Sequence, residues 1–256
     1  MIALRKRLRQ DERMLATFSI IPSVEVVQLI ALAGFEAVIL DTEHGPYGVE
    51  HLVPLIAGAH ARQMHAIVRV RENSPGWIGA ALDAGADGIL VPQVASPREA
   101  EAAVAAARFA PLGRRGANPW VSAAGFSGDP GWFAAANEAV AVIVMIEGAE
   151  GVASADEIIR TPHLDGVFLG PVDLSHALGV PGELGHPSVI AKIEEVVALA
   201  KSRSMSTAVF APTPAGAKAW LDRGVGLVAL GVDTAHILAG LVSAREATLL
   251  PDAPET

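Results

Sequence analysis

The chain has 256 residues, of which 51% are hydrophobic and 18% are charged, and 28 acidic against 19 basic side chains give a net charge of −9. This composition supports a large core and argues against disorder, and the acidic balance disfavours nucleic acid as a partner because phosphate binding needs a basic surface. The absence of cysteine excludes disulfides, thiolate metal sites and cysteine nucleophiles.

The elements predicted along the chain alternate between helices and buried strands. The basic, amphipathic stretch 1–10 is predicted to form a short helix that closes one end of the domain. Strands are predicted at 15–20, 37–40, 66–70, 88–91, 140–146, 166–169, 206–210 and 225–230. Helices are predicted from about 23, over 50–62, 74–84 and 96–109, from about 151 and 186, over 214–223, and from 233 onward.

Each predicted strand is a continuous apolar run, which is typical of a parallel sheet whose two faces are both covered by helices. Eight such strands alternating with about eight helices, with no break in composition, predict a single α/β domain over 1–256 with the (β/α)8 TIM-barrel fold. The stretch 110–132 is long for a connection in such a barrel, and we expect it to act as a lid.

Ionisable and polar side chains stand where the predicted strands end. Asp41, Glu43 and His44 follow the second strand directly. The ends of later strands present Arg69, Gln93, Glu147, Asp173 and Asp233. Burying charged groups is costly unless they are paired or bind something. Since these barrels bind their substrates at the carboxyl ends of the strands, we expect the active site there.

Two of these carboxylates predict a metal site. Glu147 and Asp173 end neighbouring strands and suit a hard divalent cation that takes its remaining ligands from water and substrate. Asp173 could instead cap the helix that follows it, whereas glutamate is a poor cap. The turn Gly170-Pro171-Val172-Asp173 opens a helix and leaves backbone N–H groups free to seat a substrate carboxylate.

Arg69 follows a buried apolar run, where a permanently charged planar donor suits an oxyanion. The four lysines all fall in predicted helices, so none is placed to form a Schiff base: Lys6, Lys192, Lys201 and Lys218. The sequence also contains neither a P-loop nor a strand–GxGxxG–helix fingerprint, so nucleotide chemistry has no support.

Seven short motifs occur along the chain in this order: Asp41-Thr42-Glu43-His44-Gly45, Val68-Arg69, Leu90-Val91-Pro92-Gln93-Val94, Gly113-Arg114-Arg115-Gly116, Ile146-Glu147, Gly170-Pro171-Val172-Asp173-Leu174-Ser175 and Gly231-Val232-Asp233-Thr234. Each is weak alone, but the ordered set covers nearly the whole chain. It closely resembles the HpcH/HpaI aldolases, particularly their 4-hydroxy-2-oxoheptanedioate and 2-dehydro-3-deoxyglucarate aldolase branch.

The resemblance implies a metal-dependent (class II) pyruvate aldolase on a (β/α)8 barrel. By this resemblance Glu147 and Asp173 hold Mg²⁺ or Mn²⁺, with Co²⁺ as a further candidate. His44 is the base and Arg69 stabilises the transition state. The substrate carboxylate is gripped at the turn formed by Gly170, Pro171, Val172 and Asp173. Met145 stands where relatives often have a glutamine that contacts substrate, which leaves donor or acceptor recognition open.

The family also has an aspartate that raises the basicity of the histidine, and Asp83 is the matching position. Asp83 ends the helix predicted over 74–84, so we expect it at the face opposite the site, from which it could reach a His44 only across a subunit interface. Asp41 is the alternative orienting residue. The resemblance therefore implies a homo-oligomer, a hexamer with helix exchange, whose C-terminal helix packs on or exchanges with a neighbouring subunit.

The implied reaction is the reversible cleavage of a 4-hydroxy-2-oxo acid, through a metal-stabilised enolate, into an aldehyde and pyruvate or a substituted pyruvate such as hydroxypyruvate. Arg114, Arg115 and Trp120 could shape the aldehyde pocket, or Arg115 could only brace its loop. Two alternatives stay open. One is a CoA-thioester lyase of the malyl-CoA or citramalyl-CoA type, although no stretch indicates a CoA site. The other is a barrel that binds a 2-oxo acid without turnover.

Localisation follows from the apolar runs. None reaches membrane-spanning length, and no apolar segment with a cleavage site follows the basic N-terminus. We therefore expect a cytoplasmic protein with no membrane partner.

Overall fold

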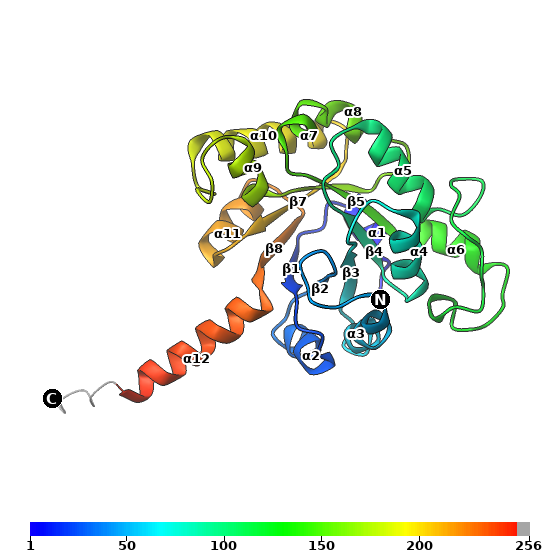
Figure 1. Cartoon of the computed structure of the whole chain (residues 1–256), viewed down its shortest axis with the longest axis horizontal. Helices are drawn as coiled ribbons and strands as arrows, with labels where there is room; N and C mark the ends of the chain where they lie inside the picture. Colours follow the sequence, from blue (N-terminus) through cyan, green and yellow to red (C-terminus); the bar gives the residue numbers. More distant parts are fainter. Residues whose placement is uncertain (250–256) are drawn as a thin grey trace.

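The computed structural model describes residues 1–249 as a closed barrel of eight parallel strands, hydrogen-bonded in chain order from β1 to β8 (Figure 1). The strands are β1 (Met14–Ser19), β2 (Ala37–Asp41), β3 (His65–Arg69), β4 (Gly88–Val91), β5 (Ala141–Ile146), β6 (Gly166–Leu169), β7 (Ser206–Ala211) and β8 (Leu227–Val232). The predicted TIM barrel is confirmed, with strand ends shifted by only one or two residues. The last part of the predicted domain, 250–256, lies outside the described residues.

Most helices surround the barrel, whereas α1 (Leu4–Arg9) closes one end of it and α6 (Trp132–Ala139) and α12 (Asp233–Leu249) extend away from it (Figure 1). The others are α2 (Val24–Leu32), α3 (Leu52–His60), α4 (Pro75–Asp83), α5 (Pro97–Ala107), α7 (Ala149–Ala153), α8 (Ala155–Ile159), α9 (Pro171–Ala177), α10 (Pro187–Ser202) and α11 (Pro214–Asp222). Two 3₁₀ turns, η1 (Val49–His51) and η2 (Ser122–Ala124), lie in connections. The helix predicted from about 151 is in fact two short helices, α7 and α8, and α6 was not anticipated.

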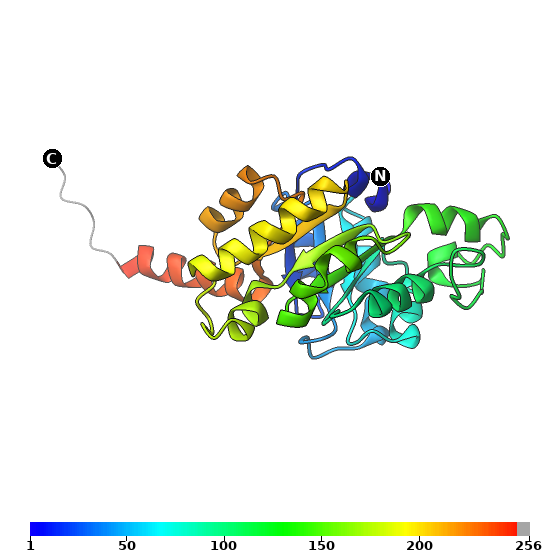
Figure 2. The ribbon, with the colours of Figure 1, turned by 90° about the horizontal axis from the view of Figure 1, so that it is seen from above.

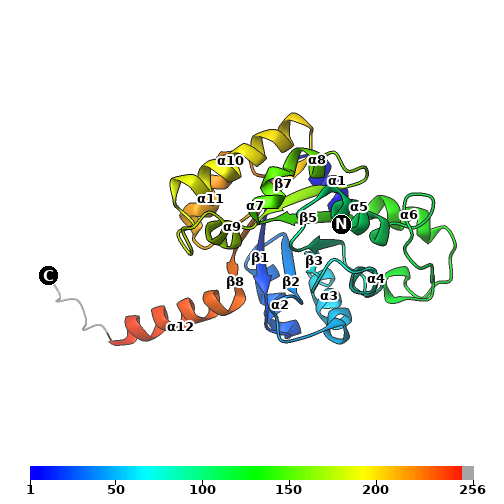
Figure 3. The same ribbon diagram turned by 45° about the horizontal axis from the view of Figure 1, so that its top comes forward.

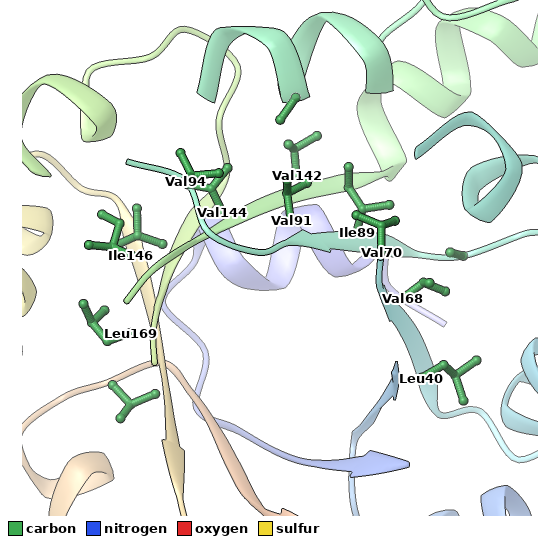
Figure 4. Packing of buried hydrophobic residues seen from close by; sticks show 14 of the residues in the cluster. Leu40, Val68, Val70, Ile89, Val91, Val94, Val142, Val144, Ile146 and Leu169 are labelled. Atoms are coloured by element: carbon green, nitrogen blue, oxygen red, sulfur yellow. The ribbon is translucent and has the colours of Figure 1, made fainter. Parts of the chain in front are cut away.

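Alternation along each strand divides the core into two layers. In β2, Ile39 packs inside the barrel with Leu90, whereas its neighbour Leu40 packs outside. Figure 4 shows this outer layer, where Val91 and Val142 lie between the strands and the surrounding helices. Because the side-chain period of a strand is two, the residue two positions beyond each inner residue also points inward. This rule decides which residues reach the mouth of the barrel.

The other end of the barrel is closed by α1, as predicted for the stretch 1–10. Leu4 and Leu8 are buried in the inner layer of the core. Arg5, also buried, donates from Nε to Oδ1 of Asp165 over 2.7 Å. Arg108 donates to the other oxygen of the same carboxylate. Helix α1 therefore closes one end of the barrel and leaves the carboxyl ends of the strands as its open end.

Two parts of the chain extend from opposite sides of the barrel (Figures 1 and 2). One is the segment 110–131 together with α6. The other is α12, which leaves β8 between α11 and α2 and points away from the barrel (Figure 3). Among residues 233–249 only Asp233 is buried. Within residues 1–249, no helix combines the length and apolarity needed to cross a bilayer.

Candidate active site at the carboxyl ends of the strands

Strand alternation brings the predicted site residues to one place. Ile39 and Ile67 belong to the inner layer of the core, so Asp41 and Arg69, two positions further along, also face the barrel axis. By the same rule Glu147 follows Met145. The register pairs Asp41 directly with Arg69. Charged side chains from three strands thus meet at the mouth of the barrel.

A cavity of about 340 Å³ opens at this mouth. Its lining includes nine predicted site residues from four strand ends: Asp41, His44, Arg69, Met145, Glu147, Gly170, Pro171, Val172 and Asp173. Phe18, Phe168 and Phe210 form an apolar wall beside them, with Phe18 packed edge-to-face against the other two rings. The cavity therefore combines an apolar wall with a cluster of charges, as small-molecule sites commonly do.

Arg69 is fixed by two carboxylates and one ring. Its Nε and Nη2 donate to Oδ1 and Oδ2 of Asp41 over 2.9 and 2.6 Å, and Nη1 lies 3.1 Å from Oε2 of Glu43. The guanidinium carbon also lies 4.7 Å from the centre of the Phe18 ring. Such a forked, bidentate arrangement leaves little rotational freedom. Arg69 is therefore a preorganised positive group at the cavity.

Glu147 is the most perturbed carboxylate of the site. It is 6% exposed, and burial, reinforced by the negative charges of Asp173 and Glu43, raises its pKa to about 7. Oε1 accepts a 2.7 Å hydrogen bond from the backbone N–H of Gln93. Its other oxygen lies against Gly170, where an added Cβ would come within 2.7 Å of it. Crowded, buried carboxylates of this kind suit a divalent cation, which would compensate their charge.

No three side chains of residues 1–249 form a preassembled set of metal ligands. Glu147 and Asp173 nevertheless line the same cavity, and both also line the groove next to it. Two protein carboxylates with the remaining positions left to water and substrate is a common arrangement for Mg²⁺. The donor set that is present therefore fits such an ion.

His44 lies at the rim of the cavity with its side chain 68% exposed. Its Nε2 is 3.9 Å from Oε2 of Glu43. Oδ1 of Asp41 accepts the backbone N–H groups of Glu43 and His44, over 3.1 and 3.3 Å. Asp41 therefore fixes the turn that carries His44 and binds Arg69, and its hydrogen bonds do not include the imidazole ring.

Asp83 lies where the sequence predicted it, at the last residue of α4 and outside the cavity of its own chain. Its Oδ1 accepts a 2.6 Å hydrogen bond from Nη2 of Arg115, whose guanidinium packs on the ring of Phe109. Within one chain segment 110–132 does not reach the cavity, so it is not a lid over it, and the contact with Asp83 fits the alternative that Arg115 braces its loop. Arg115 is buried beside α4, Trp120 is exposed, and the segment extends from the side of the barrel (Figure 1).

The family model described as HpcH/HpaI aldolase/citrate lyase matches residues 17–239. The chain belongs to this family. A 5-keto-4-deoxy-D-glucarate aldolase of Salmonella paratyphi C is 36% identical over 226 residues, which cover 88% of each chain. A pyruvate aldolase of Rhizobium etli is 32% identical over 246 residues, covering 95% of this chain and 97% of that one.

A solved HpcH/HpaI family protein of Burkholderia cenocepacia superposes with a TM-score of 0.91 at 31% identity, covering 96% of this chain and 98% of that one. The HpcH/HpaI resemblance seen in the sequence motifs is thereby confirmed. The curated relatives are aldolases, so the chain is assigned to the carbon–carbon lyases at this coarse level.

The HpcH/HpaI motifs did not indicate every residue that takes part in the site. Glu43 and Gln93 stood among the strand-end residues but had no predicted role, although they contact Arg69 and Glu147 respectively. Phe18, Phe168 and Phe210 were missed altogether. Counting the strand period of two outward from the inner-layer residues Ala16 and Ala208 would have found Phe18 and Phe210. The contact between Gln93 and Glu147 joins two strands and leaves no signal in either motif.

Proposed function

We propose that this chain is a divalent-cation-dependent (class II) aldolase. It would cleave a 4-hydroxy-2-oxo acid into an aldehyde and pyruvate, or a substituted pyruvate such as hydroxypyruvate. The observation that carries the proposal is Glu147, a buried carboxylate with a pKa near 7 that shares one cavity with Asp173 and the fixed Arg69. The aldolase names of the curated relatives support the reaction class.

Glu147 and Asp173 are the residues that would hold the ion, with Mg²⁺ or Mn²⁺ preferred and Co²⁺ a further candidate. When bound, the ion would act as a Lewis acid on the keto oxygen of the substrate. The first-turn N–H groups of α9, at Val172 and Asp173, would receive the substrate carboxylate. Met145 and Phe168 would line the apolar part of the cavity beside it.

His44 would take the proton from the 4-hydroxyl group of the substrate, because its imidazole lies at the rim where an aldehyde could leave. The C3–C4 bond then breaks, its electron pair moves to C3, and the product fragment becomes the enolate of the 2-oxo acid. Negative charge builds on the former keto oxygen. Arg69, already held by Asp41 and Glu43, would stabilise that charge without reorganising.

The test is exchange of the pyruvate methyl protons for deuterium, which reports enolate formation without knowledge of the aldehyde. Exchange is followed by proton NMR with Mg²⁺, and with Mn²⁺ by spectra taken after removal of the ion. We expect exchange that stops with a chelator and in Glu147→Gln, but persists in Glu157→Gln, an exposed glutamate of α8.

Exchange that survives chelation would contradict the metal requirement. Binding of metal and pyruvate without exchange would favour a non-catalytic barrel. Cleavage of malyl-CoA in preference to 4-hydroxy-2-oxo acids would favour the CoA-thioester lyase.

We further propose that the protein is a homo-oligomer, a hexamer by its family resemblance, in which α12 packs on or exchanges with a neighbouring copy. Leu238 and Leu241 of α12 are 63% and 65% exposed, which is costly for a helix that meets only water. Assembly would also give Asp83 its only route to a His44. Cytoplasmic localisation remains part of this proposal.

A further inference from the structure

Gln93 has a backbone conformation that its residue type does not favour. It lies two residues beyond β4 with φ of 56°, in the left-handed region that side chains with a Cβ adopt only rarely. Gln93 is exposed, so burial of its side chain does not account for this conformation. Unfavourable backbone of this kind persists where neighbouring groups require it, and it concentrates at functional sites.

The neighbours of Gln93 are two carboxylates of the candidate site. Its backbone N–H donates to Oε1 of Glu147 over 2.7 Å, and its side-chain Nε2 donates to Oε1 of Glu43 over 3.2 Å. The second oxygen of Glu43 lies 3.1 Å from Nη1 of Arg69. One uninterrupted series of contacts therefore runs from Glu147 through Gln93 and Glu43 to Arg69.

This series of contacts holds Glu147, Glu43 and Arg69 in fixed positions relative to one another. Glu147 and Glu43 carry like charge and come from different strand ends, so each is repelled by the other. Gln93 donates one hydrogen bond to each and carries no charge itself. The N–H at Oε1 of Glu147 also leaves Oε2 as the oxygen free of this bond, on the side of Gly170.

We propose that Gln93 is a positioning residue: its left-handed backbone aims an N–H at Glu147 while its side-chain amide holds Glu43 against Arg69. The inference rests on the proposed function, because the two effects that it assigns to Gln93 concern the binding of the cation and the formation of the enolate. The backbone sets the affinity for the cation. The side-chain amide sets the rate at which the enolate forms.

The two effects are separated by substitutions that change one feature at a time. Gln93→Met keeps the length of the side chain and the backbone N–H but removes the donor to Glu43. We expect the kcat of pyruvate methyl exchange to fall roughly tenfold, the loss typical of a hydrogen bond to a charged group, while the Kd for Mn²⁺ stays within about twofold. The Mn²⁺ Kd is measured without substrate, from the free-ion signal in electron paramagnetic resonance.

Gln93→Val introduces a β-branched side chain, which disfavours the left-handed backbone. We expect the Mn²⁺ Kd to rise roughly tenfold, because the N–H would no longer be directed at Glu147. Gln93→Gly tolerates the left-handed backbone and should retain the wild-type Kd while sharing the low exchange rate of Gln93→Met.

Gln63 supplies the matched control, since it is also an exposed glutamine, has φ of 58°, and follows α3 at the other end of the barrel. Gln63→Val should lower the Tm as Gln93→Val does, yet leave Mn²⁺ affinity and exchange unchanged. If Gln93→Val binds Mn²⁺ as tightly as Gln93→Gly, or Gln93→Met exchanges at the wild-type rate, the positioning role is wrong and the proposed function stands. If the wild-type protein binds no Mn²⁺, both fall.

Discussion

At the scale of single residues, the site depends on the close approach of the Glu147 side chain to the backbone of Gly170. Glu147 lies over Gly170, and an added Cβ there would come within 2.7 Å of Oε2 and 2.8 Å of the Glu147 Cβ. Contacts this short force the carboxylate to move. Gly170 has φ of −93°, so any residue could adopt its backbone, and only the close approach requires glycine.

We therefore expect Gly170→Ala to weaken Mn²⁺ binding by roughly tenfold or more while the protein stays folded, because a displaced carboxylate loses its place next to Asp173. Isothermal titration calorimetry measures the affinity, and circular dichroism checks the fold. Gly148→Ala is the control, since a Cβ at Gly148 meets no atom within 4 Å. Equal losses in both variants would mean that the effect is not the contact with Glu147.

At the scale of elements, Asp87 joins the end of α3 to the start of β3. Its Oδ2 accepts hydrogen bonds of 2.8 Å from Nε2 of His60 and from the backbone N–H of Ala66. Burial by itself would raise the pKa of Asp87, but these hydrogen bonds, with His65 Nδ1 3.6 Å from the same oxygen, lower it to about 2. In turn the bond to Asp87 raises the pKa of His60, against the effect of burial.

This pair should make stability depend on pH. The raised pKa of His60 stabilises the fold below the ordinary histidine pKa of about 6.5, and this contribution is lost as pH rises through the folded-state value. The lowered pKa of Asp87 stabilises the fold above about 4, and this contribution is lost as pH falls toward 2.

We expect the difference in unfolding free energy between wild type and His60→Gln to be largest between about pH 4 and 6, and to shrink on either side. Urea unfolding at a series of pH values measures it. His176→Gln, at an exposed histidine of α9, should show no such window. A constant difference across the range would contradict the charge-linked explanation.

A second set of contacts between elements lies at the end of the barrel that α1 closes. Asp165, fully buried just before β6, is shared by Arg5 of α1 and Arg108 after α5. Removing one partner of a buried ion pair leaves charge without compensation. We expect Asp165→Ala to lower the free energy of unfolding by about 3–5 kcal/mol in urea titrations. Asp222→Ala, which removes an exposed partner of Lys218 on α11, should cost less than about 1 kcal/mol.

At the scale of the whole molecule, α12 is the helix that packs least against the rest of its own chain, since only Asp233 of it is buried. It has 17 residues, about 25 Å of helix, and extends beyond the barrel between α11 and α2 (Figure 3). Leu238, Leu241 and Val242 follow helical spacing, so they lie on one side of it. On α2, Leu29 and Leu32 are also exposed.

We expect the double substitution Leu238→Glu/Leu241→Glu to lower the molar mass measured by light scattering after size-exclusion chromatography, because charges would replace buried apolar contacts between copies. Ser243→Glu, on the other side of the same helix, should leave the mass unchanged. A wild-type protein that elutes as a monomer would contradict the proposed assembly.

Much of this protein is determined by local sequence. Continuous apolar runs identified the eight strands, and the period of two that places Ile39 inside the barrel also directs Asp41 to its mouth. Asp41, Arg69, Glu147 and Asp173 could therefore be assigned to one site before any contact was known. Their residue types also indicated a cation and an oxyanion.

Tertiary structure decided the rest, because the deciding contacts join distant parts of the chain. The segment expected to be a lid instead packs Arg115 against Asp83, and nothing in its own residues indicates that partner. Gln93 adopts its left-handed backbone beside Glu147, 54 positions further along the chain. The direction of α12 depends on what its apolar side chains pack against, which one chain does not supply. The periodicity of the sequence determines the face of the strand on which a side chain lies, whereas the folded packing determines which residues that side chain contacts.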